Sequence, residues 1–186
     1  MGVKELATLS TGVTFPNPKH YKQNLAKLQR LSKVYCRKAS CSNNKHKAKI
    51  QLARHHARIA NLRKDTLHKL TTYLCKNHAK IVVEDLNVSG MLSNHKLAQA
   101  IADCGFYEFK RQLEYKAKKF GCDSLRGEAI IIIADRFYPS SKTCSRCGHK
   151  KENLSLSERI YCCENCGFEI DRDLNAAINL SRLAKA

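Results

Sequence analysis

Two closely spaced cysteine pairs are the clearest chemical signal in this chain of 186 residues. Cys144 and Cys147 form one Cys-x-x-Cys pair, and Cys163 and Cys166 form a second pair after fifteen intervening residues. A Cys-x-x-Cys turn holds two thiolates on one side of a tight knuckle, and two such knuckles can surround a tetrahedral zinc ion. Four thiolates leave no open coordination position, so the pattern predicts one structural zinc ion and not a catalytic one.

Two neighbours of these pairs are weaker candidates for metal binding. Cys162 lies beside Cys163, but its use would change the second pair to Cys-x-x-x-Cys, so we expect Cys163 to be the ligand. His149 follows the first pair, and we expect it not to bind the metal. A redox-active Cys-x-x-Cys is the alternative interpretation, and the presence of two pairs at this spacing disfavours it.

Two pairs of acidic residues could bind a different kind of metal. Glu84 and Asp85 end the apolar segment KIVVED, and Asp171 and Asp173 begin the segment DRDLNAAINL. Carboxylate oxygens suit Mg²⁺, and Mg²⁺ ions held by several acids can promote cleavage of a phosphodiester bond. The residues alone also allow a simpler interpretation, in which the aspartates cap a helix and Glu84 is a surface carboxylate.

The elements that position these residues follow from hydrophobic periodicity. Apolar runs predict short strands within residues 3–15 (a hairpin), 80–84 and 129–134. Helical periodicity predicts helices at residues 21–34, 45–77, 94–119 and 171–184. Gly105 should interrupt the third helix, and the all-apolar strand at 129–134 should be a central strand covered on both faces. This order predicts an α/β domain with a cysteine module (residues 141–169) inserted before its last helix.

Positive charge is concentrated in one third of the chain. The formal net charge is +18, and residues 19–79 contain 16 Lys or Arg against one acid, Asp65. Two basic helices joined by a short loop predict an antiparallel hairpin, here named the basic hairpin, that attracts phosphate backbones. A membrane surface fits less well, because these helices lack a large apolar face. We expect a cytoplasmic protein that associates with the nucleoid when it binds DNA.

Three segments, VVEDLNVSGM, FYEFKRQLEYKAKKFG and the run from RFYPSSKTCSRCG to DRDLNAAINL, resemble the TnpB (OrfB-type) insertion-sequence transposase family. Its members are RNA-guided DNA endonucleases related to type V CRISPR effectors, associated with transposition and DNA recombination. The resemblance implies an RNase H-like (RuvC-type) domain in residues 1–140, including the basic hairpin, completed by a helix in residues 170–186. It also implies that residues 141–169 are a zinc ribbon that binds target nucleic acid, with DNA and a guide RNA as partners.

The resemblance also assigns roles to individual acids. Glu84 and Asp173 match the second and third catalytic acids of the family and are expected to bind Mg²⁺, with Asp85 and Asp171 as their neighbours. The first catalytic acid lies in a segment like GIDxGVKxLA, and it would fall just before Met1. The resemblance therefore implies an N-terminally truncated chain that binds nucleic acid and cleaves little by itself. The alternatives are an active RNA-guided endonuclease, if the true start lies upstream, and a gene remnant.

Overall fold

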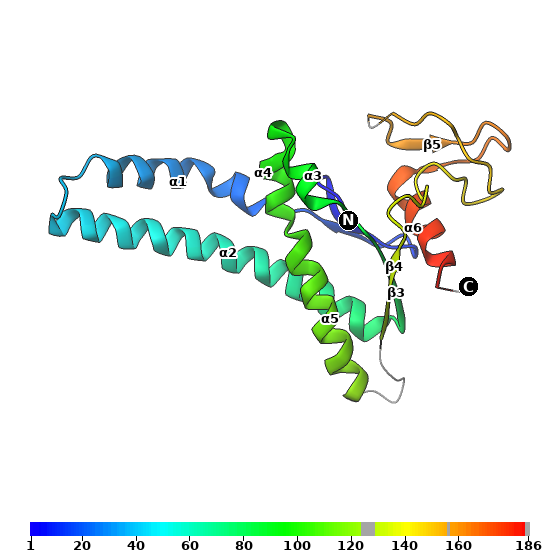
Figure 1. Cartoon of the computed structure of the whole chain (residues 1–186), viewed down its shortest axis with the longest axis horizontal. Helices are drawn as coiled ribbons and strands as arrows, with labels where there is room; N and C mark the ends of the chain where they lie inside the picture. Colours follow the sequence, from blue (N-terminus) through cyan, green and yellow to red (C-terminus); the bar gives the residue numbers. More distant parts are fainter. Residues whose placement is uncertain (124–128, 156, 185–186) are drawn as a thin grey trace.

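The computed structural model describes residues 1–123, 129–155 and 157–184. Its helices are α1 (His20–Cys36), α2 (Asn43–Asn77), α3 (Val88–Leu92), α4 (His95–Cys104), α5 (Phe106–Asp123) and α6 (Arg172–Arg182). Its strands are β1 (Glu5–Thr8), β2 (Thr14–Pro16), β3 (Lys80–Glu84), β4 (Ile130–Ala134), β5 (Ile160–Cys162) and β6 (Glu169–Asp171). Figure 1 shows the helical arm of α1 and α2 on one side and the cysteine module on the other. The predicted mixture of helices and strands is confirmed.

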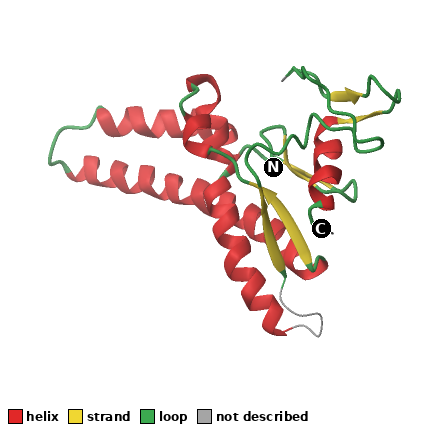
Figure 2. Cartoon of the chain, turned by 45° about the vertical axis from the view of Figure 1, so that its right-hand side comes forward, coloured by secondary structure: helices red, strands yellow, loops and turns green. Residues whose placement is uncertain are grey.

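The strands of the described residues pair two by two. β1 pairs antiparallel with β2, β3 pairs parallel with β4, and β5 pairs antiparallel with β6. The parallel register sets Glu84 opposite Ala134, so both strands end at the same level. Figure 2 shows β3 and β4 side by side, with α6 next to them.

The prediction of a central, doubly covered strand at residues 129–134 is wrong. Within the described part of the chain, β4 pairs with β3 alone, and the side chains of Ile130 and Ile133 are 54% and 48% exposed. A continuous apolar run indicates that a strand packs against other apolar side chains. It does not indicate how many strands lie beside it.

The basic hairpin has the predicted antiparallel form, because α1 and α2 lie alongside each other and are joined by a short loop (Figure 1). Ser42 caps the start of α2 by accepting a hydrogen bond of 3.1 Å from the backbone N–H of Lys45. Only a few residues are buried between the two helices, chiefly Leu28, Ala48 and Ile59. None of the described helices combines the length and apolar character needed to cross a membrane.

The main core lies where the C-terminal half of α2 packs against α5 and the strands. Leu70 of α2 and Leu113 of α5 are each 1% exposed and pack with Ile81 of β3 and Leu6 of β1 in one cluster. Burial of such side chains is the principal stabilising contribution. Gly105 separates α4 from α5 with φ 65°, as predicted, because this left-handed conformation suits glycine.

A network of hydrogen-bonded polar side chains crosses the interface between α2 and α5. Glu108 of α5 accepts hydrogen bonds from Arg111 at 2.8 Å and from Gln112 at 3.0 Å. The side-chain oxygen of the fully buried Gln112 accepts a bond of 3.1 Å from the hydroxyl of Thr71 on α2. Lys116 donates a bond of 2.8 Å to the same hydroxyl. These contacts satisfy groups that burial would otherwise penalise.

Candidate metal centre and acidic cavity

Four cysteine thiols meet at one point of the cysteine module. The Sγ atoms of Cys144, Cys147, Cys163 and Cys166 all lie within 4.8 Å of one another. The Cys144–Cys166 and Cys147–Cys163 sulfur distances are 3.8 Å and 3.6 Å. A tetrahedron with Zn–S bonds of ~2.3 Å has sulfur atoms roughly 3.8 Å apart. The four thiols therefore form a cluster that fits a metal such as zinc.

Two knuckles of the same design shape the cluster. Gly148 donates a backbone hydrogen bond of 3.0 Å to Cys144, and Gly167 donates one of 3.0 Å to Cys163. Both glycines have positive φ, 79° and 65°, a conformation that L side chains rarely adopt. The glycine after each pair is what allows the chain to turn back over the two thiols.

The electrostatics of the cluster favour a bound cation. The backbone N–H of His149 lowers the pKa of Cys147 to about 6. The backbone N–H of Phe168 also favours the Cys166 thiolate, but burial and the neighbouring thiols raise the pKa of Cys166 to about 12. Four adjacent thiols cannot all ionise without a compensating positive charge. A divalent ion would supply that charge.

The two weaker metal candidates lie outside the cluster. Cys162 is exposed, and its thiol lies 3.6 Å from the carboxylate of Glu169. His149 contributes its backbone carbonyl, which accepts a bond of 2.8 Å from the N–H of Cys144, and its side chain is not part of the cluster. The structure thus groups Cys163, and not Cys162, with the other three thiols.

Helix α6 fixes the cysteine module to the rest of the protein through two buried asparagines. The Asn175 side chain accepts a bond of 2.9 Å from the Ser145 N–H and donates one of 2.8 Å to the Thr143 carbonyl. Asn179 donates bonds of 2.8 Å to the Ser140 carbonyl and 2.6 Å to the Thr143 carbonyl. Sequence reasoning did not single out this pair. Its signal was present, because asparagines four residues apart on a helix share one face.

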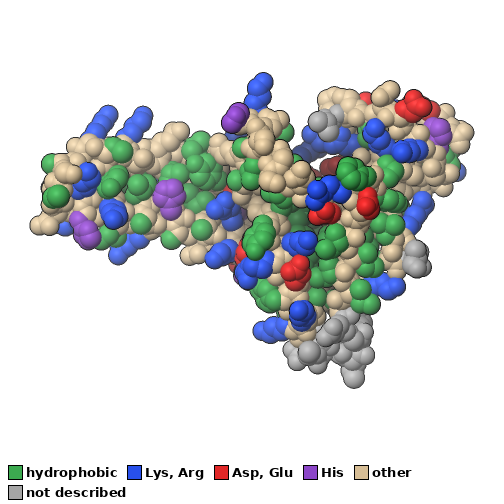
Figure 3. Space-filling model, viewed as in Figure 1, with side chains coloured by type: hydrophobic (Ala, Val, Ile, Leu, Met, Phe, Trp, Pro, Cys, Tyr) green, Lys and Arg blue, Asp and Glu red, His purple; other side chains and the backbone are tan. Residues whose placement is uncertain are grey.

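Glu84 and Asp173 line one cavity although they are far apart in the sequence. This acidic cavity has a volume of about 470 Å³ and is also lined by Glu5, Met1, Lys142 and Arg172. Glu84 reaches it from the end of β3, and Asp173 from the first turn of α6. The Ser140 hydroxyl donates a bond of 3.2 Å to Oε1 of Glu84. Figure 3 shows the molecule hollowed beside the cysteine module, with acidic side chains nearby.

The two neighbouring acids have other partners. Asp85 forms an ion pair with Arg136, with 2.7 Å between Oδ2 and Nη2. Asp171 caps α6 by accepting bonds from the N–H groups of Asp173 and Leu174 at 2.9 Å and 3.0 Å. The capping interpretation therefore describes Asp171, whereas the side chain of Asp173 lines the acidic cavity, with its Oδ1 3.7 Å from Nε of Arg172.

An apolar groove of about 350 Å³ lies next to the acidic cavity. Every residue of β3 lines it, as do Thr8 of β1 and the following Leu9 and Ser10, while β2 and β4 contribute none of the lining residues described. The free edges of β1 and β3 therefore border the same groove. Gly2 donates a backbone bond of 3.3 Å to Leu6, and Met1 lines both the groove and the acidic cavity.

Two protein-family models match this chain. The family model OrfB_IS605, described as "Probable transposase", matches residues 1–95, about half of the chain. The chain belongs to the OrfB_IS605 family. A second model, "Cas12f1-like, TNB domain", matches residues 106–180, which include the cysteine module and most of α6. The resemblance to TnpB (OrfB-type) proteins is thus confirmed.

Curated relatives of this OrfB_IS605 family member match nearly its whole length. A "Putative RNA-guided DNA endonuclease" of Streptomyces pristinaespiralis is 42% identical over 96% of this chain and 42% of the relative. The protein of the same description from Escherichia coli (strain K12), InsQ, is 37% identical over 96% of this chain and 46% of the relative. "TnpB-like protein L79" of Acanthamoeba polyphaga mimivirus is 31% identical over 87% of this chain and 31% of the relative. The chain spans less than half the length of each of them.

Proposed function

We propose that this chain contains the metal-dependent cleavage region of an RNA-guided DNA endonuclease encoded by an insertion sequence. In this proposal residues 1–140 and 170–186 belong to an RNase H-like (RuvC-type) domain, and residues 141–169 are a zinc ribbon that contacts target nucleic acid. The observation that carries the proposal is that Glu84 and Asp173 line one cavity. The names of the relatives, as RNA-guided DNA endonucleases, support the reaction class.

Glu84 and Asp173 would bind Mg²⁺ in the acidic cavity. Bound there, Mg²⁺ would activate a water molecule and stabilise the leaving oxygen of a phosphodiester. Ser140 would orient Glu84 through its hydroxyl. Lys142 and Arg172 line the same cavity, and their positive charges favour a phosphate at its mouth.

Glu5 also lines the acidic cavity, but among the described residues Glu5, Glu84 and Asp173 do not gather closely enough to form a group of three metal ligands. Among the described residues, the four cysteines are the one closely gathered group of three or more side chains suited to hold a metal. We therefore propose that this chain alone cleaves DNA poorly and that a further carboxylate, close to Glu84 and Asp173, completes the site. Because Met1 lines the acidic cavity, a residue placed directly before Met1 would be close enough to supply it.

The basic hairpin would bind nucleic acid, with DNA and a guide RNA as partners. Figure 3 shows Lys and Arg side chains spread along the visible face of this arm. Its 16 Lys or Arg and single acid give it a net charge of +15. Each phosphate that such residues neutralise releases counterions, so affinity should fall with salt with a log–log slope of about −0.9 per contacted phosphate of duplex DNA.

Nucleic-acid binding without cleavage is the second candidate function. It is favoured for this chain by itself because no three carboxylates gather closely among the described residues. It predicts salt-dependent binding of RNA or DNA that persists in Glu84→Ala. Binding that stayed constant between low and high salt would contradict the electrostatic basis of both functions.

Two extended chains that differ at a single residue test the cleavage proposal. The chain is extended before Met1 by Gly-Ile-Asp, or by Gly-Ile-Asn as the matched control, and Mg²⁺ binding and cleavage of labelled single-stranded DNA are measured. We expect the Asp form to bind Mg²⁺ more tightly and to cleave, and we expect Glu84→Ala and Asp173→Ala to abolish both gains. Equal Mg²⁺ affinity of the Asp and Asn forms, or cleavage that survives both substitutions, would overturn the proposal.

A further inference from the structure

We propose that Phe137 is a stacking platform for a nucleobase of single-stranded nucleic acid held beside the acidic cavity; this inference rests on the proposed function. The Phe137 side chain is 87% exposed, the highest value among the large hydrophobic residues described. An aromatic ring displayed in this way loses the benefit of burial, which a planar partner would restore.

The loop that carries Phe137 is held in place by its other residues. The Asp135 carboxylate accepts a bond of 2.7 Å from the backbone N–H of Phe137 itself. Arg136 is paired with Asp85, and the Tyr138 hydroxyl donates a bond of 3.4 Å to the Asn179 carbonyl. These contacts fix the backbone on both sides of Phe137 while its ring remains exposed. Because its backbone is already held, Phe137 loses less conformational entropy when a ligand stacks on its ring.

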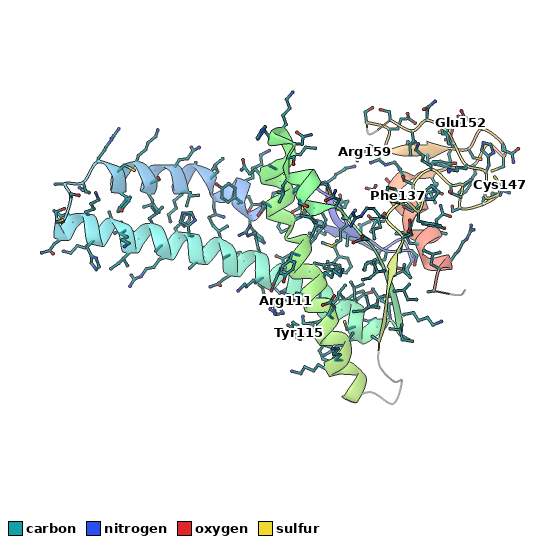
Figure 4. All side chains as sticks on the ribbon, viewed as in Figure 1. Arg111, Tyr115, Phe137, Cys147, Glu152 and Arg159 are labelled. Atoms are coloured by element: carbon teal, nitrogen blue, oxygen red, sulfur yellow. The ribbon has the colours of Figure 1, made fainter. Side chains whose placement is uncertain are left out.

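The position of the loop connects Phe137 to the acidic cavity. Phe137 follows β4 by three residues, and the last residue of β4 lies opposite Glu84 in the parallel register. Ser140, three residues further on, donates its hydroxyl hydrogen to Glu84. Figure 4 shows Phe137 where the chain leaves β4, beside α6 and below the cysteine module. The ring therefore stands at the same end of the β3–β4 pair as the two acids.

The charges at this end of the β3–β4 pair suit a nucleic acid. Arg136, immediately before Phe137, is paired with Asp85, whereas Lys142 and Arg172 line the acidic cavity. A base flanked by phosphates needs one flat ring and nearby positive charge, because stacking supplies affinity for any base.

The chain contains no tryptophan, so one substitution creates a specific reporter. Phe137→Trp is titrated with a short single-stranded oligothymidylate, and the indole fluorescence is recorded. The matched control is Tyr107→Trp, because Tyr107 on α5 is also highly exposed, at 78%. We expect strong quenching at position 137 and much weaker quenching at position 107. In raised salt, which weakens the phosphate contacts, Phe137→Leu should bind about 5-fold or more weakly than Phe137→Trp.

The possible failures of this experiment are distinguishable. If the wild-type chain does not bind the oligonucleotide, the proposed function fails and the inference fails with it. If the oligonucleotide binds but quenches positions 107 and 137 equally, or if Phe137→Leu binds as tightly as Phe137→Trp, only the stacking inference is overturned. Circular dichroism of each variant checks folding, which we expect to be unchanged because the side chain is exposed.

Discussion

The hydroxyl of Ser140 donates a hydrogen bond of 3.2 Å to Oε1 of Glu84, which joins the loop leading into the cysteine module to the end of β3. The backbone carbonyl of Ser140 accepts a second bond, of 2.8 Å, from Asn179 of α6. One residue therefore connects the strand that carries Glu84 with the helix that carries Asp173. The spacing of the two acids depends on this connection.

We expect Asn179→Ala to destabilise the protein by about 1–3 kcal/mol, because the substitution leaves the buried carbonyls of Ser140 and Thr143 with fewer hydrogen bonds. The matched control is Ser181→Ala on the same helix, whose hydroxyl bonds locally to the Ile178 carbonyl and whose loss should change stability by less than about 0.5 kcal/mol. Chemical denaturation measures the free energy of unfolding of both variants. Equal unfolding midpoints for the two variants would show that α6 does not hold the module through Asn179.

The adjacent cysteines give a sharp test of the metal centre. We expect the purified protein to contain one zinc ion per chain, Cys162→Ser to retain it and Cys163→Ser to lose it, because Cys163 belongs to the four-thiol cluster and Cys162 does not. Elemental analysis by mass spectrometry gives the metal content. Chelation should unfold the cysteine module, since metal binding and folding are coupled in such sites. Loss of zinc from Cys162→Ser with retention in Cys163→Ser would reverse the assignment.

Stability should depend on the charge of Glu108 at acid pH. Hydrogen bonds from Arg111 and Gln112 lower the pKa of Glu108 to about 2 from the usual 4.5. A carboxylate with a lowered folded-state pKa stabilises the protein above about pH 4.5, and this contribution is lost as the pH falls toward 2. The difference in unfolding free energy between wild type and Glu108→Gln should therefore be largest above pH 4.5 and shrink below it. A difference that stayed constant from pH 6 to pH 2 would contradict the assignment.

The free edges of β1 and β3 predict that the apolar groove accepts a strand. We expect an extension of about six apolar residues before Met1 to slow amide hydrogen exchange in β3, at Val82 for example, by roughly tenfold or more, because it would pair with the exposed edges. The control extension carries a proline at its centre, which removes a backbone donor. Equal exchange rates with both extensions would show that the groove does not take a strand, and would weaken the RNase H-like assignment.

Local patterns in this sequence predicted structure well. The two Cys-x-x-Cys pairs and their following glycines set their own geometry within a few residues, so the spacing alone predicted the thiol cluster. The strand at residues 80–84 and the break at Gly105 also depend on neighbouring residues only. Helix α3 was not predicted, because its segment VSGML contains a glycine, and its start depends on capping by the side chain of Asn87.

Features that depend on distant contacts were harder to predict. The roles of Asn175 and Asn179 depend on carbonyls more than thirty residues away, and their shared helix face does not by itself identify these partners. The edge position of β4 depends on which strands are present beside it, and its apolar sequence does not encode this. Periodicity also could not bring Glu84 and Asp173 together. Their assignment came from family resemblance, and the cavity they share is a tertiary feature.

Helix α2 sets a fixed distance between the tip of the basic hairpin and the core. It runs without interruption for 35 residues, roughly 52 Å at 1.5 Å per residue. Its last turns are built into the core and lead within a few residues to β3 and Glu84, whereas its first turns lie at the tip of the basic hairpin. In the proposed function, a nucleic acid held at that tip would be kept at a set distance from the acids. That length equals about 15 nucleotide steps of 3.4 Å, so the arm would determine how far from the bound tip the backbone meets Glu84.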